Sequence, residues 1–277
     1  MGLDRANIIT LGSALPPAVG IFGRLEALLA RPDTELDAIV DLVRVDPALT
    51  FQIIRLGNSA FYGLKNRCDS LEQAVSRIGF GDIHSLVGLV AARHACQQDL
   101  RAYQISARQF WENAVATGQL MAALAAANGT DARQAYSTGL LRNLGRIVLN
   151  NHAGAVRYPG AAVAPDLAAW ERENYGTTAG EVGAVLLEHW RFSPDTIAAV
   201  RGHLDPAAAE APVLLLHVAA GLAESWGMGI PGEAGGWSRD AAVLARAGLS
   251  EDICRAATAS AQIAYDKIAG IQWANAA

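Results

Sequence analysis

The sequence lacks the short motifs that mark several common classes of enzyme and metal-binding protein. No G-x-S-x-G elbow, H-E-x-x-H motif or C-x-x-C pair occurs in its 277 residues. It has three cysteines, Cys68, Cys96 and Cys254, which are far apart in the chain. An odd number of isolated cysteines argues against a disulfide framework and against a zinc site. We therefore interpret them as small buried hydrophobic residues in a reducing compartment.

An excess of positive charge and a long apolar run are missing as well. The formal net charge is −5, so the overall field repels polyanions and nucleic acid is not expected as a partner. Weakly polar stretches such as Ala114 to Ala127 are shorter than the roughly 18 apolar residues of a membrane span. There is no basic, apolar and A-x-A leader at the N-terminus. We predict a cytoplasmic protein that binds neither nucleic acid nor membrane.

Apolar residues at helical spacing dominate what is present. They recur three and four positions apart along most of the chain, and no strand-like alternation competes with this pattern. Residues of hydrophobic type make up 52% of the sequence, which is ample for a core without metals or disulfides. Side chains suited to capping precede many of the apolar stretches, notably Asp33 or Thr34, Asp46, Ser70, Asp82, Asp131 and Ser193. The pattern predicts an all-α fold.

The predicted helices fall into two packed blocks, residues 1–104 and 105–277. The second block ends in a helical extension with an apolar helix over Val213 to Ala223, a glycine-rich loop from Trp226 to Trp237 and two closing helices. The glycines of the loop do not form a phosphate-binding G-x-x-x-x-G-K pattern, and no predicted strand leads into them. We interpret this segment as a mobile surface loop rather than a nucleotide cradle.

The stretch from Ser137 to Asn150, S-T-G-L-L-R-N-L-G-R-I-V-L-N, organises the second block. Its leucines recur at helical spacing and predict one buried helix. Between them Arg142, Asn143 and Arg146 share one polar stripe. Divalent ions are bound by imidazole and carboxylate groups at such a position, whereas a guanidinium group repels them.

Two segments resemble a known family. The central stretch is similar to the G-L-L-H-D-x-G-K signature of HD-superfamily phosphohydrolases. Residues 46–63, D-P-A-L-T-F-Q-I-I-R-L-G-N-S-A-F-Y-G, resemble the D-P-x-L-x-x-x-x-L-x-x-x-N-S-A-x-Y/F pattern of HDOD proteins, the non-enzymatic branch of that superfamily. The likeness extends from about Leu15 to His203. It implies that the second block is HD-like and that the protein takes part in bacterial signalling.

The resemblance also implies where the metal ligands of HD enzymes would lie, and this sequence departs from them. Asn113 stands where the family motif W-x-H-S supplies a histidine. Arg142 and Asn143 replace the paired His-Asp, and Arg146 replaces the lysine. Ala179 occupies a further histidine position, and only His203 remains of a His-His pair. We therefore expect a degenerate HD site that binds no metal and no cofactor.

The sequence is compatible with three functions. The first is a signalling or regulatory protein that acts by protein–protein interaction without catalysis, with an unknown partner from a signalling pathway. A groove between the two blocks would suit a helical ligand. Tyr62 and Phe61 are candidate anchors for such a ligand, and the alternative is that they only fill the core between the blocks.

The second is a sensor of a small anionic ligand or nucleotide. Arg142 and Arg146 can pair with phosphate or carboxylate. They could instead pair with local carboxylates such as Glu181 or Glu188.

The third is a metal-dependent phosphohydrolase with a rebuilt site. Such a site needs at least three converging ligands. The candidates are His152, His189, His203, Glu188 and Asp205.

Overall fold

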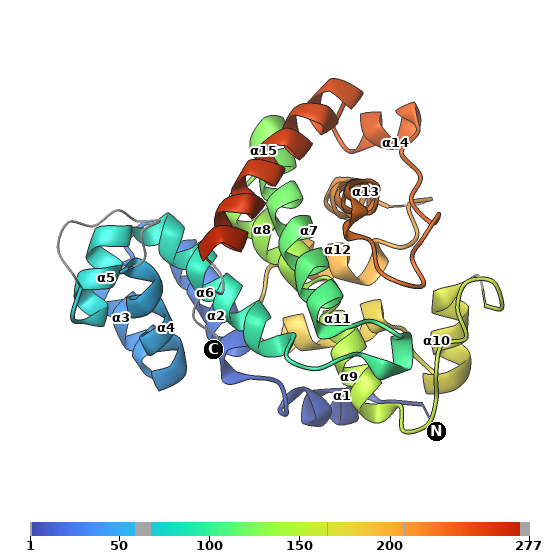
Figure 1. Ribbon diagram of the computed structural model, residues 1–277, viewed down its shortest axis with the longest axis horizontal. Coiled ribbons are helices and arrows are strands. Elements are labelled where there is room, and N and C mark those ends of the chain that lie inside the picture. The colour runs from blue at the N-terminus through green and yellow to red at the C-terminus, as the bar shows by residue number, and fades with distance from the viewer. Residues whose placement is uncertain (1, 59–67, 165, 208, 272–277) are drawn as a thin grey trace.

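The protein is a succession of helices, and longer loops precede α10 (Leu167–Tyr175) and α14 (Ala241–Arg246) (Figure 1). The computed structural model describes residues 2–58, 68–164, 166–207 and 209–271. In these ranges the regular elements are helical, and extended pairing is limited to an isolated bridge between Leu100 and Ile105. The predicted all-α class is confirmed.

Six helices form the first block. They are α1 (Arg5–Gly12), α2 (Pro17–Leu29), α3 (Leu36–Arg44), α4 (Pro47–Gly57), α5 (Leu71–Ile78) and α6 (Phe80–Ala95). The predicted caps Asp46 and Ser70 accept hydrogen bonds from backbone amides of the helices that follow them. Asp82 was predicted to cap α6 and does not, because Gly79, at φ 87°, turns the chain directly from α5 into α6. The sequence pattern also missed α1, which Asp4 caps.

The 3₁₀ turn η1 (Arg101–Tyr103) ends the first block and packs against α9 of the second. The second block is built around α7, the long helix near the centre of Figure 1. Its elements before the C-terminal extension are α7 (Ala107–Asn128), α8 (Ala132–Leu141), α9 (Leu144–His152), α10 (Leu167–Tyr175), α11 (Ala179–His189) and α12 (Pro194–Gly202). A capping box of Ser106 and Gln109 starts α7, and Thr178 with Glu181 starts α11 in the same way.

The C-terminal extension folds back onto this block. It comprises α13 (Ala211–Ala223), the π-helical turn η2 (Glu224–Met228), α14 (Ala241–Arg246) and α15 (Glu251–Ile271). Both α13 and α15 pack against α7, and Figure 1 shows α15 running beside it. The segment from η2 to α14 is thereby held against the second block.

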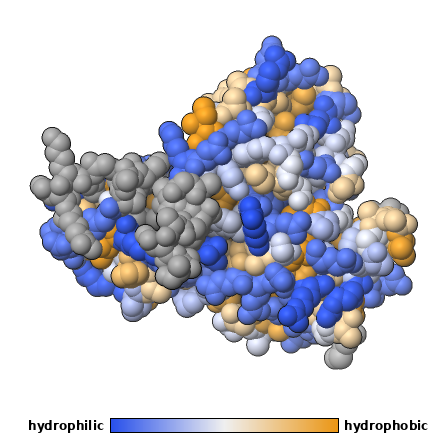
Figure 2. Space-filling view, in the orientation of Figure 1, coloured by the Kyte–Doolittle hydropathy of each residue, from blue (hydrophilic) through white to orange (hydrophobic). Residues whose placement is uncertain are grey.

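The two blocks share one hydrophobic core. Helix α1 packs against α9 and α11, and α6 packs against both α2 and α8. The buried apolar side chains from both blocks form a single connected cluster. The face shown in Figure 2 is mostly hydrophilic where it is coloured, with scattered hydrophobic patches.

Within the described ranges, one helical segment is apolar enough to cross a membrane by length and composition alone. It is Ala211–Met228, and 61% of it is buried inside the protein, where α13 packs on α7 and α12. The bent pairs α1–α2 and α5–α6 meet the same criterion only if each pair is counted as one span.

The stretch from Ser137 to Asn150 forms two helices, so the prediction of one continuous helix is wrong. Helix α8 ends at Leu141, and Asn143, at φ −100° and ψ 12°, turns the chain into α9. Each half is fixed against a different helix. A Cβ atom on Gly139 would lie 2.6 Å from the carbonyl oxygen of Thr117 in α7, and one on Gly145 would lie 2.0 Å from that of Ala179 in α11. These close contacts hold Arg142 and Arg146 on either side of a turn.

Candidate functional site

Two buried arginines meet a single carboxylate inside the second block. Arg142 follows the end of α8 and Arg146 lies in the first turn of α9, and each side chain is only 1% exposed. Arg142 binds Glu233 with two parallel hydrogen bonds, Nη1 to Oε1 at 3.1 Å and Nη2 to Oε2 at 2.8 Å. Arg146 donates to the same Oε1 through Nη2. The fork-to-fork geometry makes Glu233 an internal anion for both cations.

Glu233 comes from the glycine-rich loop of the C-terminal extension. That loop was predicted to be a surface segment, which is wrong for Ile230 and Glu233, at 3% and 6% exposure. Gly232 and Gly235, with φ of 88° and 77°, permit the turn that aims the carboxylate inward. Trp237 follows it and stacks on His203, with ring centroids 6.1 Å apart. The loop therefore covers the arginine pair and contributes to the site.

Polar side chains complete the surroundings of Arg142. Asn113 Oδ1 accepts hydrogen bonds from Arg142 Nη2 at 2.8 Å and from Asn143 Nδ2 at 3.2 Å. The side-chain Nδ2 of Asn113 donates to the carbonyl oxygen of Met228 at 2.7 Å. This bond connects α7 to the start of the glycine-rich loop. His203 Nε2 lies 3.3 Å from Arg142 Nη1.

His203 is neutral in this arrangement. A guanidinium group can only donate, so Nε2 accepts and the proton is assigned to Nδ1, 3.0 Å from the carbonyl oxygen of Val200. Burial, reinforced by the charge of Arg142, lowers the pKa of His203 to about 3. Burial alone would raise the pKa of Glu233, but Arg142 and Arg146 outweigh it and bring this pKa down to about 2. Glu233 is therefore ionised and His203 is uncharged at neutral pH.

A second buried carboxylate lies on the other side of Arg146. Glu171, in α10, accepts a hydrogen bond from the hydroxyl of Tyr103 at 2.9 Å and from the backbone amide of Ala179 at 2.7 Å. Arg146 lies over the Tyr103 ring, 5.5 Å from its centroid. Burial raises the pKa of Glu171, although the nearby charge of Arg146 opposes this. The methyl side chain of Ala179 cannot bind a metal, but its backbone amide helps to position Glu171.

Of the six positions predicted as the degenerate HD site, four are joined to one another by side-chain hydrogen bonds, and the other two bond to nearby carboxylates. Asn113, Arg142, Asn143 and His203 form one hydrogen-bonded group. Arg146 joins it through Glu233, whereas the backbone amide of Ala179 bonds to Glu171, which lies outside this hydrogen-bonded group. Tyr62 and Phe61, the predicted interaction residues, lie outside the described residues.

Sequence reasoning missed Glu233, Glu171, Tyr103 and Trp237. They are distant in the chain from the arginines, and no local pattern connects them. The proposed pairing of the arginines with Glu181 or Glu188 is wrong. Glu181 bonds to Thr177 and Arg172, and Glu188 pairs with Arg5 at 2.7 Å.

The residues present do not fit the metal centre of HD enzymes. The guanidinium group of Arg142 occupies the middle of the group, where it would repel a cation. Throughout the described ranges, no three His, Cys, Asp or Glu side chains are placed to hold a metal ion. The alternative ligands do not converge either: His152 ends α9 in an exposed position, and Glu188 is engaged with Arg5.

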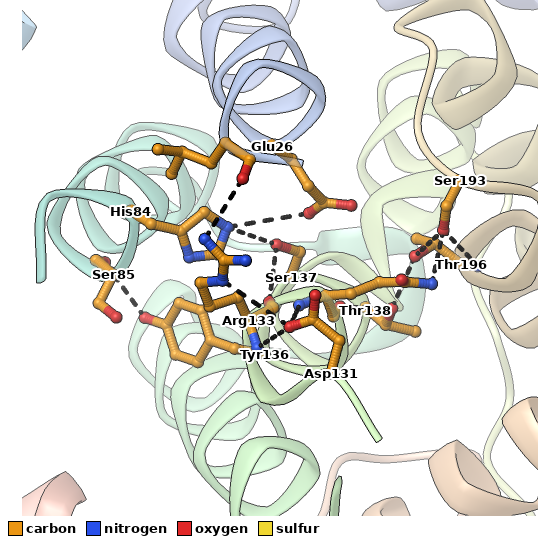
Figure 3. A network of polar contacts seen from close by, with 12 residues as sticks. Glu26, His84, Ser85, Asp131, Arg133, Tyr136, Ser137, Thr138, Ser193 and Thr196 are labelled. Atoms are coloured by element: carbon orange, nitrogen blue, oxygen red, sulfur yellow. Dashed lines mark hydrogen bonds and ion pairs between the residues drawn. The ribbon is translucent and has the colours of Figure 1, made fainter. Parts of the chain in front are cut away.

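A separate polar cluster contains a serine, a histidine and a glutamate. Figure 3 shows Ser137 of α8 and Glu26 of α2 both facing one nitrogen of His84 in α6. That nitrogen, Nε2, is 3.2 Å from Ser137 Oγ and 3.9 Å from Glu26 Oε2. In a catalytic triad the carboxylate instead orients the opposite ring nitrogen. Since Ser137 is also fully buried, the cluster joins three helices and does not form a nucleophile site.

A groove of about 640 Å³ lies between the first block and the end of α11. Its lining residues are Pro17, Gly20, Ile21, Arg24, Val45, Asp46, Pro47, Ala48, His94, His189, Trp190 and Arg191. Val45 is 68% exposed. The lining combines apolar side chains with two arginines and two histidines against one aspartate. It is therefore a mainly apolar groove whose lining includes two arginines and one aspartate.

Comparison with known proteins identifies the fold and a family. The model of the HDOD domain matches residues 15–206. An uncharacterised protein of Treponema pallidum (strain Nichols) is 29% identical over 190 residues, which are 65% of this chain and 35% of that protein. The chain thus spans about a third of the length of this curated relative.

Solved structures from three bacteria share the fold. One from Marinobacter aquaeolei VT8, provisionally named a signal transduction protein, superposes with a TM-score of 0.71 at 25% identity, covering 93% of this chain and 59% of that one. One from Shewanella amazonensis SB2B, provisionally named a phosphohydrolase, gives 0.65 at 25% identity, covering 91% of both chains. An HDOD domain protein of unknown function from Geobacter sulfurreducens gives 0.67 at 19% identity, covering 93% of this chain and 91% of that one.

Proposed function

Because the chain belongs to the HDOD domain family, we propose that it is a bacterial cytoplasmic signalling protein that binds another protein and catalyses no reaction. The provisional name of the Marinobacter structure, a signal transduction protein, agrees with this role. The provisional name of the Shewanella structure, a phosphohydrolase, suggests the competing one. The internal ion pair at the arginines favours the signalling role.

The ion pair argues against hydrolysis because it fills the place of a catalytic centre. Asn113 accepts hydrogen bonds from Arg142 and Asn143, and Arg142 also donates to Glu233. They leave no set of neutral imidazole and carboxylate groups to bind a divalent ion and activate water. The single observation that carries the proposal is this Arg142–Glu233–Arg146 group, which makes the former reaction site a packed part of the protein.

The groove between the blocks is the proposed docking surface. Val45 and Trp190 provide apolar contact on opposite walls, and Arg24 and Arg191 provide positive charge. We propose that the partner inserts a helix with an apolar face flanked by acidic residues, because such a helix complements both the shape and the charge. The described lining of the groove comes from α2, the connection between α3 and α4, the start of α4, and the ends of α6 and α11.

The test is capture of a partner by the purified protein and by two matched variants. Val45→Glu places a negative charge in the groove at a position that is already 68% exposed, so folding should be kept while an acidic partner is repelled. Val163→Glu makes the same change at a 74% exposed valine that does not line the groove. Proteins retained by wild type and Val163→Glu but lost with Val45→Glu support the proposal. Equal retention by all three refutes this surface.

A second candidate function is a sensor of a small anionic ligand. The observation in its favour is that two buried arginines converge on one carboxylate. A measurement of phosphate binding, described next, tests it.

A further inference from the structure

We propose that Arg142 and Arg146 form a binding site for a phosphate dianion and that Glu233 occupies this site as an internal substitute. The inference rests on the sensor function and specifies both its ligand class and the segment that moves. Binding of the ligand and docking of the loop that carries Glu233 would then exclude each other.

The charge of the group favours a dianion over a carboxylate. Two buried guanidinium groups share the single negative charge of Glu233. The other nearby carboxylate, Glu171, is hydrogen-bonded to Tyr103 and Ala179 and to neither arginine. Burial also raises its pKa, which favours its neutral form and weakens it as a counter-charge. A buried cation with no full counter-charge is costly. A phosphomonoester carries nearly two negative charges at neutral pH, so it would balance both arginines.

The hydrogen-bond count points the same way. Among the described residues, no acceptor is within bonding distance of Arg142 Nε, Arg146 Nε or Arg146 Nη1. Buried donors of this kind are rare and destabilising. Glu233 has only two oxygens, and both are already used. The terminal oxygens of a phosphate group supply additional acceptors for the same planar donors.

The loop that carries Glu233 is the segment that would move away from the arginines. It lies between η2 and α14, outside any helix, and has glycines at positive φ on either side of the glutamate, Gly232 and Gly235. Its backbone makes local turn bonds at Glu233, from its amide to Ile230 at 3.4 Å and from Gly236 to its carbonyl at 3.1 Å. Side-chain contacts hold it in place: Glu233 binds the arginines, and Trp237 packs on His203 and Arg142. Two further contacts fix it, from the Gly235 amide to Glu224 Oε1 at 3.2 Å and between His217 Nε2 and the carbonyl oxygen of Ser238 at 3.1 Å. The loop can therefore open without unwinding a helix.

Glu233→Ala is the main test, because it removes the internal carboxylate and leaves its space. Thermal unfolding of the full chain is measured with increasing potassium phosphate and with potassium chloride at equal ionic strength. We expect phosphate to raise the Tm of Glu233→Ala in a saturable way, by about 5–10 °C at a hundredfold excess over Kd. Wild type should need a higher concentration because Glu233 competes. The double variant Arg142→Met with Glu233→Ala should lose the response.

Glu188→Ala is the matched control, since it removes a carboxylate from an exposed pair with Arg5. It should respond to phosphate no more than wild type does. If Glu233→Ala folds only when phosphate is added and not with chloride, that is also the expected result. Glu233→Gln keeps the side-chain volume without the charge and is measured alongside. Absence of a phosphate-specific shift in both Glu233 variants overturns the proposal.

Two further ligands separate the possible outcomes. Acetate resembles the atoms that Glu233→Ala removes, so a response to acetate and none to phosphate would overturn the phosphate class while keeping an anion sensor. Adenosine monophosphate compared with inorganic phosphate distinguishes a phosphomonoester ligand from the free ion. The capture experiment with Val45→Glu is independent of these measurements, so a negative result here refutes the anion site and leaves the docking surface to its own test.

Discussion

Replacing Arg142 by methionine should destabilise the protein strongly, because it breaks a buried ion pair from one side. Methionine keeps most of the apolar stem of the arginine, so the loss comes from the charge and not from a cavity. Arg142 makes two hydrogen bonds to Glu233, one to Asn113 and one contact with His203. In the variant, Glu233 would remain buried with Arg146 as its single cationic partner.

The expected cost is about 3–5 kcal/mol, the usual range for removing one partner of a buried pair. The separate hydrogen bonds would sum to more, at roughly 1.5–3 kcal/mol for each bond to a charged group, but contacts that share one carboxylate are not additive. Urea unfolding followed by circular dichroism measures the effect. With a slope of about 3 kcal/mol per molar urea, the midpoint should fall by roughly 1 M or more.

Two other variants test whether the loss of stability comes from the broken buried ion pair. Arg5→Met removes the arginine of the exposed pair with Glu188 and should leave the midpoint unchanged within error. The triple variant Arg142→Met, Arg146→Met and Glu233→Leu leaves no unpaired charge, and we expect it to be more stable than Arg142→Met alone. If Arg142→Met unfolds at the same urea concentration as Arg5→Met, the buried ion pair does not exist in solution. If the triple variant is the least stable, the ion pair is a net source of stability, and the expectation that removing all three charges restores stability is wrong.

Three further predictions concern acid, packing and metal. The pKa of His203 is lowered in the folded state to about 3. Below about pH 6.5 the unfolded chain therefore binds more protons than the folded chain, and the free energy of unfolding should fall by at most about 1.4 kcal/mol per pH unit from this group. Glu233, with a pKa of about 2, adds a loss of the same sign below about pH 4.5. His203→Gln should flatten the Tm profile between about pH 6.5 and 4.5, and an unchanged slope would show that another group causes it. Gly145→Ala should lower the Tm sharply because the new methyl would lie 2.0 Å from the carbonyl oxygen of Ala179, whereas Gly81→Ala, with nothing within 4 Å, should be tolerated; equal Tm values would disprove the close α9–α11 contact. Elemental analysis of purified protein should find no stoichiometric iron, manganese or zinc, and a value near one metal per chain would contradict the degenerate site.

Local signals in the sequence determined most of the helices. Caps such as Asp46, Ser70 and Asp131 bond to backbone amides within three residues, so their effect is encoded where they stand. The HD positions could be identified from the sequence for the same reason, because each lies in a short motif. Arg142 and Arg146 were predicted either to bind an anionic ligand or to pair with a carboxylate of the chain, and the structure shows them paired with the carboxylate of Glu233.

The identity of that anion was decided only by tertiary structure. Glu233 lies 91 residues from Arg142 and 87 from Arg146, and the loop that carries it has no pattern that distinguishes a buried carboxylate from an exposed one. Its place depends on α13 packing against α7, which brings the loop over the site. The break between α8 and α9 has a similar origin, since Gly139 and Gly145 are held by different helices. Helical periodicity describes contacts within a few residues, whereas a pairing of charges depends on which distant surfaces the core brings together.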